Sequence, residues 1–393
     1  MKIALTCPAS LPATQFGGIL FLCIDIAREL AKKNHNMTIY TTDLDFGNGT
    51  NLFSRELPIT ENYDGFTIKR SHVYSKIKLF FINPGMYMQI KKDMPDLIHV
   101  VGIRSFQAIV GAGLSKLYNI PLVVSDQGGL LTHPDFEGKK IISFLYRLQE
   151  PFVKFIIKQA RKIIVANEYE EKIFSEYCDK SKMSLVRNGI NFENISSSSF
   201  DFKKKYKIKG KMILFIGRFN KVKGIDLLLD AFVEICKLRE FDDVILAILG
   251  VDFGYQNEMM EKIIELKMQN RVRVIQKPPR EDLIAAYHAC EFAVLPSRWE
   301  MSPLTPLEVF SCKKTVISTN AYGIPHVVID GKNGLLVPPN NPKKITESII
   351  TLLNDVNMRN RLGCEGFKMV ENECNSKNMA KQILQVYSSI LNK

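Results

Sequence analysis

Cationic side chains and a glycine occupy a short turn in the second half of the chain. Arg218, Lys223 and Gly224 lie between the apolar segment KMILFIG (211–217) and the helix-like segment IDLLLDAFVEICKL (225–238). A strand-to-helix turn at the edge of a parallel sheet brings such cations together with the positive end of a helix, which suits a diphosphate. The turn does not match the Walker phosphate loop. Taken by itself, the turn is better explained by solvated side chains on a surface turn, so the surrounding sequence has to decide.

Two carboxylates occupy a similar position further along the chain. Glu300 and Glu308 lie in PSRWEMSPLTPLEVFSC (296–312), which follows an apolar segment, crosses a short loop and enters a predicted helix. A carboxylate at a helix start can accept hydrogen bonds from both ribose hydroxyls of a nucleotide, while the amides of Leu304 and Thr305 can donate to a phosphate. Glu300 would then reach the sugar end of the ligand. Carboxylates that bind hydroxyl groups, together with cations that bind phosphates, fit a nucleotide-sugar as the ligand.

The same residues also allow a purely structural interpretation of Glu308. Thr305, Pro306 and Glu308 fit a capping box, with Thr305 as the N-cap, proline at the first helical position and glutamate at the third. In that case the Glu308 carboxylate would satisfy the helix terminus rather than a ligand. The sequence leaves both interpretations open.

Buried strands alternate with amphipathic helices on both sides of the middle of the chain, as in GILFLCIDIARELAKK (18–33). The predicted strands are 2–7, 37–42, 97–102, 121–126 and 162–167 in the first half, and 211–217, 244–250, 271–276, 292–296 and 314–319 in the second. Strand, helix and strand in repetition favour an α/β protein with parallel sheets. We therefore expect two Rossmann-like, doubly wound domains facing each other across a cleft, with ligands at the carboxyl ends of the strands.

The domain boundaries are predicted from composition. Residues 1–195 form the first domain, and residues 211–370 form the second. A serine run and a lysine run in 196–210 predict an exposed interdomain linker. Residues 371–393 are expected to be a C-terminal helix that packs on either domain, including back on the first.

Composition excludes several classes of protein. Of the 393 residues, 46% are hydrophobic and 24% charged, and no run of about 18 apolar residues predicts a spanning helix. The eight cysteines are scattered without a C-x-x-C pair, so neither a disulfide framework nor a zinc site is expected. We predict a cytoplasmic protein whose N-terminus is a buried strand rather than a signal peptide. The net charge of +12 fits phosphate-bearing substrates or an anionic membrane, and no motif supports nucleic-acid binding.

Five segments together resemble the family-4 glycosyltransferases, which are retaining enzymes of the GT-B class. In the second half they are FIGRFNKVKGIDLLLDAF (215–232), VLPSRWEMSPLTPLEVF (294–310) and GIPHVVIDGKNGLLVPP (323–339). In the first half, FGGILFLCIDIARELAKKNHNMTIYTTD (16–43) resembles the family's glycine loop and first helix, and VRNGIN (186–191) resembles its domain junction. The resemblance covers nearly the whole chain.

The resemblance implies a role for each matching residue. Arg218 and Lys223 would bind the donor diphosphate and stabilise the charge that develops on the leaving group, together with Glu300 as the catalytic set. The implied donor-binding residues are Gly17, Gly18, Arg218, Lys223, Glu300, Ser302, Leu304, Thr305 and Glu308. The implied reaction transfers a sugar from a nucleotide-diphosphate sugar to a hydroxyl acceptor (a glycan, a lipid-linked glycan or a small molecule) with retention. No metal and no further cofactor is implied. A GT-B-type nucleotide-sugar epimerase and a non-catalytic nucleotide-sugar binder remain alternatives.

The sequence departs from the family pattern at two places. Met301, Ser302 and Pro303 follow Glu300, where the family usually has glycine, and Pro303 lacks an N–H donor. Asp126 and Gln127 lie where many members carry a histidine. These two residues and Asn188 are the candidates for contact with the sugar or the acceptor.

Weaker signals come from the first half of the chain. Asp43 and Asp45 match the D-x-D metal motif of the other glycosyltransferase architecture, although an ordinary polar loop is the preferred interpretation. Segments 76–93 and 139–162 mix Lys and Arg with aromatic and aliphatic residues, which is compatible with peripheral contact to the inner face of a membrane near a lipid-linked acceptor. Equally, their apolar faces can belong to the core, which we prefer for 139–162. The sequence does not fix the oligomeric state.

Overall fold

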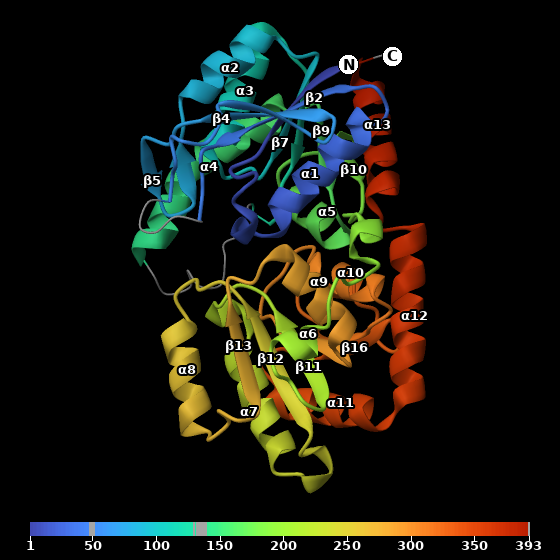
Figure 1. The fold of residues 1–393 in the computed structure, drawn as a ribbon. Coiled ribbons are helices and arrows are strands. Elements are labelled where there is room, and N and C mark those ends of the chain that lie inside the picture. The colour runs from blue at the N-terminus through green and yellow to red at the C-terminus, as the bar shows by residue number, and fades with distance from the viewer. Residues whose placement is uncertain (47–51, 129, 131–139, 392–393) are drawn as a thin grey trace. The chain divides into compact units, whose positions relative to one another are not determined.

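The computed structural model describes residues 1–46, 52–128, 130 and 140–391 (Figure 1). The chain divides into two compact units. The first contains Met1–Ile190 and Ser376–Lys393, and the second contains Asn191–Asn375. Each unit is built around one sheet with helices, so the predicted pair of α/β domains is confirmed.

The sheet of the first unit has the strand order β10-β9-β8-β7-β1-β2-β4-β3, and only β3 runs antiparallel to its neighbour. Five strands were predicted: β1 (Lys2–Thr6), β2 (Asn36–Thr42), β7 (Leu97–Val101), β8 (Leu122–Ser125) and β9 (Lys162–Val165). Three were not: β3 (Thr60–Tyr63), β4 (Phe66–Ser71) and β10 (Met183–Leu185). The predicted strands are those buried on both faces, as expected for the centre of a parallel sheet.

Helices and one hairpin complete the first unit. The helices are α1 (Gly18–Ala31), α2 (Gly85–Asp93), α3 (Phe106–Tyr118), α4 (Lys140–Gln159), α5 (Glu168–Phe174) and α13 (Ser376–Leu391). A separate two-stranded hairpin is formed by β5 (Ser75–Ile77) and β6 (Phe80–Ile82). Helix α1 covers the predicted segment and buries Leu22, Cys23, Ile26 and Leu30 on one face. Among the described residues, no helix has the length and apolar character needed to span a bilayer.

The second unit has an all-parallel sheet of order β13-β12-β11-β14-β15-β16. Its strands are β11 (Lys211–Ile216), β12 (Val244–Gly250), β13 (Val272–Gln276), β14 (Phe292–Leu295), β15 (Val316–Thr319) and β16 (Gly334–Val337), of which β16 was not predicted. Its helices are α6 (Phe202–Lys205), α7 (Ile225–Cys236), α8 (Gln256–Glu265), α9 (Arg280–Ala289), α10 (Thr305–Ser311), α11 (Pro342–Asn354) and α12 (Val356–Asn372). Because β11 and β14 are neighbours, the loops that follow them start from one edge of the sheet.

The segment 196–210 is largely exposed, as predicted, but it lies within the second unit rather than between the two units. It belongs to the second unit, where Phe202 is buried and Lys205 donates to both carboxylate oxygens of Asp282 at 2.7 and 2.8 Å. Tyr206 also donates to this fully buried carboxylate. The polar composition therefore conceals a short helix that is attached by two buried apolar side chains, Phe202 and Ile208, and by the buried Asp282 carboxylate.

The C-terminal helix α13 packs in the first unit, against α1. Its Tyr387 hydroxyl contacts Nδ1 of His99 on β7 at 2.6 Å, and Nε2 of His99 contacts the Ser125 hydroxyl at 2.7 Å. Burial lowers the pKa of His99 to about 3, so the ring is neutral and links α13 to two strands.

This buried histidine predicts a pH-dependent effect on stability. In the unfolded chain His99 takes up a proton below its ordinary pKa of 6.5, whereas in the folded chain it does so only near 3. Its contribution is therefore complete above pH 6.5 and is lost as the pH falls toward 3, by about 2 kcal/mol at pH 5. We expect His99→Gln to be less stable than the wild type at pH 7, and this deficit to shrink by about 2 kcal/mol at pH 5. Urea unfolding of both proteins at the two pH values measures it, and a deficit independent of pH would contradict it.

Candidate active site

The turn after β11 is held against the loop after β14. Gly224, between the short 3-10 helix Lys221–Lys223 and α7, has φ +70°, and a Cβ there would lie 2.1 Å from the carbonyl oxygen of Pro296. Both the backbone conformation and the close approach require glycine. The amide of Arg298 also donates to the carbonyl of Val222 at 2.7 Å. The two loops that carry the predicted site residues therefore form one rigid structure.

This arrangement brings Lys223 and Glu300 together as a half-buried ion pair. The Ser297 hydroxyl lies 3.4 Å from the same carboxylate oxygen. The Arg218 guanidinium stacks over the ring of Phe253 at 5.0 Å, and burial lowers its pKa while the charge of Glu300 acts in the opposite direction. Since arginine stays protonated in proteins, the predicted catalytic residues form a cluster of two cations and one carboxylate.

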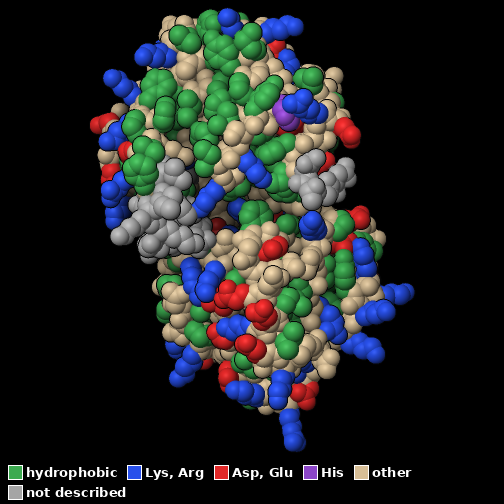
Figure 2. Space-filling model, turned by 90° about the vertical axis from the view of Figure 1, so that its left-hand side faces the viewer, with side chains coloured by type: hydrophobic (Ala, Val, Ile, Leu, Met, Phe, Trp, Pro, Cys, Tyr) green, Lys and Arg blue, Asp and Glu red, His purple; other side chains and the backbone are tan. Residues whose placement is uncertain are grey.

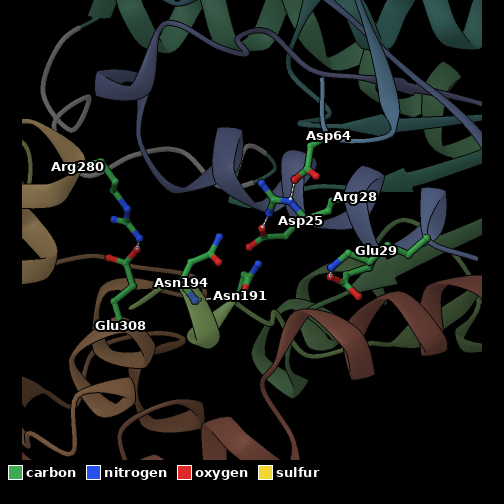
Figure 3. A network of polar contacts seen from close by, with 9 residues as sticks. Asp25, Arg28, Glu29, Asp64, Asn191, Asn194, Arg280 and Glu308 are labelled. Atoms are coloured by element: carbon green, nitrogen blue, oxygen red, sulfur yellow. Dashed lines mark hydrogen bonds and ion pairs between the residues drawn. The ribbon is translucent and has the colours of Figure 1, made fainter. Parts of the chain in front are cut away.

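Glu308 is held by side chains from a neighbouring helix rather than by its own helix terminus. Its Oε1 accepts from Arg280 at 2.5 Å (Figure 3). Its Oε2 accepts from the Tyr287 hydroxyl at 2.5 Å. Burial, reinforced by the Glu308 charge, raises the pKa of Tyr287 well above its usual range, so this phenol remains a donor. The carboxylate is thus fixed in orientation at the first turn of α10.

The capping-box interpretation of this turn is wrong. The N-cap of α10 is Leu304, Thr305 is the first helical residue, and no side chain makes a capping hydrogen bond. The two Glu308 oxygens instead accept from Arg280 and Tyr287 of α9. The local sequence fits the capping-box motif, but hydrogen-bond donors that are distant in sequence determine the contacts of the Glu308 carboxylate.

A substitution at Thr305 tests this correction. An N-cap threonine changed to alanine costs about 0.5–2 kcal/mol. Because Thr305 does not cap the helix, we expect Thr305→Ala to change the free energy of unfolding by less than about 0.5 kcal/mol. Urea unfolding measures this, with Asn341→Ala as the matched control, since Asn341 does cap α11 by accepting from the amide of Lys344 at 3.0 Å. Equal losses in the two variants would contradict it.

The residues that support the site were not found from the sequence. Arg298 pairs with both carboxylate oxygens of Asp226 at 2.7 Å and donates to the carbonyl of Lys221 at 2.6 Å, so it fixes the start of α7 to the loop that carries Glu300. Bidentate arginine–carboxylate pairs are specific in geometry. The sequence offered two signals for this ion pair: a basic residue two positions before Glu300 and an acidic residue in the first turn of α7.

The departure from the family pattern at Met301 is accommodated by packing. Met301 is buried, and the carbonyl of Glu300 accepts from the amide of Gly323 at 3.0 Å. A Cβ on Gly323 would lie 1.6 Å from the Met301 carbonyl oxygen, so that turn must be glycine. Ser302 and Leu304 are both partly exposed on the way into α10.

The candidates of the first unit lie at three of its loops. Gly17, with φ +107°, precedes α1, and Gly18 is the first residue of that helix. The Gln127 and Asn188 side chains exchange two hydrogen bonds of 3.1 and 2.9 Å, so the structure brings these two residues together. Buried Asp126 instead accepts from backbone amides, at 3.3 Å from Ile103 and 2.7 Å from Leu130.

The first unit also contains a buried acid that the sequence did not reveal. Burial raises the pKa of Glu170 to about 8, and the charge of Asp126 adds to this effect. One carboxyl oxygen accepts from the amide of Ala166 at 2.7 Å. Glu170 is therefore protonated at neutral pH, close to the loop that carries Gln127.

The D-x-D residue Asp43 is used within the fold. It accepts from the amide of Val73 at 3.1 Å and contacts Nδ1 of His72 at 2.5 Å. These contacts connect the end of β2 to the segment after β4. In the part of the chain that the structure describes, no group of three or more His, Cys, Asp and Glu side chains is arranged to hold a metal ion.

Comparison with known families identifies the chain. The family model "Glycosyl transferases group 1" matches residues 198–369, and the model "Glycosyltransferase Family 4" matches residues 16–194. The chain belongs to these glycosyltransferases. It is a retaining glycosyltransferase that uses a nucleotide-sugar donor, as the sequence resemblance implied. The two matches fall almost entirely in different units of the fold.

Curated relatives of this glycosyltransferase are distant in sequence. An uncharacterised glycosyltransferase of Methanocaldococcus jannaschii is 29% identical over 70% of this chain and 71% of its own length. Spore coat protein SA of Bacillus subtilis is 23% identical over 98% of this chain and 99% of its own. The D-inositol 3-phosphate glycosyltransferase of Corynebacterium diphtheriae is 25% identical over 92% of this chain and 89% of its own.

Solved structures show the same fold over the whole glycosyltransferase. Sucrose-phosphate synthase from Thermosynechococcus elongatus has a TM-score of 0.81 at 20% identity and covers 100% of this chain and 99% of its own. HepE of Anabaena in complex with UDP-glucose has a TM-score of 0.76 at 19% identity and covers 99% of this chain and 100% of its own.

Proposed function

We propose that the second unit binds a nucleoside-diphosphate sugar through the residues after β11 and β14. Arg218 and Lys223 bind the diphosphate, and Glu300 contacts the donor sugar. Glu308 accepts hydrogen bonds from the ribose hydroxyls, and the Ser302, Leu304 and Thr305 segment borders the nucleotide. The sugar is transferred to a hydroxyl acceptor with retention of configuration.

The observation that carries this proposal is the contact of Lys223 with Glu300 beside Arg218. An ammonium group has three donors, so Lys223 can hold the Glu300 carboxylate and a diphosphate oxygen at the same time. The arginine supplies a second cation on which the negative charge of a leaving diphosphate is stabilised. A carboxylate between two cations remains available to hydroxyl groups of a sugar.

The reaction then balances without a protein nucleophile. The bond from the anomeric carbon to the diphosphate oxygen breaks, and the acceptor oxygen bonds to the same face of that carbon. The proton of the acceptor hydroxyl passes to the departing diphosphate. Arg218 and Lys223 act as the charge rises on that group, which is where preorganised cations lower a barrier most.

A thermal-shift panel with UDP, GDP, ADP and NAD tests the donor site. UDP is the expected ligand because the structurally similar HepE is complexed with UDP-glucose. A ligand at about 100 times its dissociation constant adds about 2.7 kcal/mol of stability, and each kcal/mol raises the midpoint by roughly 2–4 °C in a domain of this size. Stabilisation by one nucleoside diphosphate supports the proposal, whereas stabilisation by NAD alone or by none of the four contradicts it.

An activity assay separates the proposal from its alternatives. A transferase releases free nucleoside diphosphate when donor and hydroxyl acceptor are both present. An epimerase changes the sugar without net release, and a simple binder leaves the donor intact. Release that requires the acceptor is the expected result.

A further inference from the structure

Helix α4 carries apolar side chains on two opposite faces. One face packs into the core of the first unit through Val153, Ile156 and Ile157. The other exposes Phe144, Leu148 and Phe152, which are 60%, 53% and 48% accessible. Their spacing of four residues places them in one row along the helix, and Pro151 and Phe155 lie in the same row. A soluble helix normally keeps such a face polar.

Basic residues line one side of this exposed row. Arg147, Lys154 and Lys158 are exposed and follow at intervals of seven and four residues, so they share one helix edge. The nearby Glu150 is paired with Arg104 at 3.1 Å, which reduces its negative contribution at this edge. The helix therefore presents an apolar row with a positive margin.

The β5–β6 hairpin extends this surface. Its turn alternates Lys76, Ile77, Lys78 and Leu79, all of them exposed, and Tyr74 just before it is also exposed. Figure 2 shows hydrophobic side chains gathered among Lys and Arg on the side of the first unit from which β5 projects in Figure 1.

The hairpin and α4 are neighbours. Phe80 of β6 lines the same small hollow as Gln149 and Phe152 of α4, and its ring contacts that of Phe106 on α3. We call Tyr74, Lys76–Leu79 and the exposed residues of α4 the α4–hairpin surface. It is continuous across two elements that are far apart in sequence.

We propose that the α4–hairpin surface binds an anionic lipid bilayer. Aromatic and aliphatic side chains enter the boundary between headgroups and acyl chains, while the lysines and arginine reach the lipid phosphates with their long stems. A second copy of the chain fits less well, because lysine is depleted in protein–protein interfaces and this surface carries four exposed lysines, Lys76, Lys78, Lys154 and Lys158. The proposal goes beyond the donor site, since lipid binding requires neither donor nor acceptor.

Vesicle flotation of the full chain tests the proposal without any sugar substrate. The protein should float with vesicles of 70% phosphatidylcholine and 30% phosphatidylglycerol at 50 mM NaCl, and bind at least tenfold more weakly to pure phosphatidylcholine. Each charge removed should weaken binding by about fivefold, so Arg147→Gln/Lys154→Gln should weaken it by about 25-fold. Phe144→Gln/Leu148→Gln should weaken it by tenfold or more. Higher salt should weaken binding by the wild type because it screens the attraction.

Matched substitutions elsewhere control for general effects. Met260→Gln/Ile264→Gln removes two exposed apolar side chains from α8, and Lys209→Gln/Lys343→Gln removes two exposed charges from the second unit. Both should leave binding unchanged, and all four variants should keep the thermal midpoint of the wild type. Equal losses in control and test variants, or no binding by the wild type, would overturn the proposal. So would a dimer, seen by sedimentation velocity, that only the α4 variants abolish while vesicle binding persists. Because the readout is lipid binding, its failure leaves the donor-site proposal untouched.

Discussion

We expect Lys223→Met to lower kcat for sugar transfer by about 10²–10³. The substitution keeps the length and apolar stem of the side chain but removes the charge that meets the departing diphosphate. Loss of one preorganised donor at a site of developing charge typically costs this factor. Because the charge grows during bond breaking, kcat should fall more than the KM for the donor rises. Steady-state release of nucleoside diphosphate, measured with the donor identified by the thermal-shift panel, gives both constants.

Lys221→Met is the matched control for this experiment. Lys221 lies two residues away in the same 3-10 helix, but its side chain is 61% exposed and pairs with Glu258, whereas that of Lys223 is 21% exposed and pairs with Glu300. Exposed ion pairs contribute little, so the control should keep kcat within about twofold. Equal losses in both variants would show that the turn attracts anions only through its general charge.

The core of the fold was predictable because its strands are continuous apolar segments. All ten predicted strands are present, and all but the edge strand β13 are buried along most of their length. The missed strand β3, with the sequence TENY, is largely exposed and polar, so it has no apolar periodicity to detect. Strand β16, with the sequence GLLV, is short and begins with a glycine. Pairing with an existing sheet edge, which the sequence does not display, makes these segments strands.

The attachment of 196–210 to the second unit was missed for a similar reason, because it depends on contacts that the local sequence does not display. Serine and lysine dominate 196–210, and this composition predicts an exposed connection. Phe202 and the contact of Lys205 with the buried Asp282 attach it to the second unit nevertheless. Asp282 lies 77 residues further along the chain. A single long-range contact of this kind leaves no local signature.

The candidate site was likewise predictable only in part: its main side chains were predicted, but the residues that support them were not. Arg218, Lys223, Glu300 and Glu308 were found because they follow strands whose ends share one sheet edge. Their supporting residues were missed because those contacts join distant segments: Asp226 and Arg298 are 72 residues apart, and Arg280 and Glu308 are 28 apart. Spacing thus predicts which groups gather at one sheet edge, whereas tertiary packing determines how they are oriented.

Glu308→Ala is expected to weaken UDP binding by at least about 100-fold. A hydrogen bond to a charged group contributes about 1.5–3 kcal/mol, and the carboxylate is proposed to accept one from each ribose hydroxyl. The substitution also leaves Arg280 and the buried Tyr287 hydroxyl without this partner, so the free energy of unfolding should fall by about 1–3 kcal/mol. Isothermal titration with UDP and urea unfolding measure the two effects separately.

Tyr287→Phe separates the ligand role of Glu308 from its structural role. This variant removes the hydroxyl that donates to Oε2 but keeps the carboxylate, its charge and the Arg280 contact. It should therefore share part of the stability loss while keeping UDP affinity within about tenfold. If Glu308→Ala lost stability but bound UDP as the wild type does, the carboxylate would serve only to hold α9 and α10 together. The donor proposal would then rest on Arg218, Lys223 and Glu300 alone. The observed orientation of Glu308 suits both packing and ligand binding, and the UDP affinity of Glu308→Ala distinguishes the two roles.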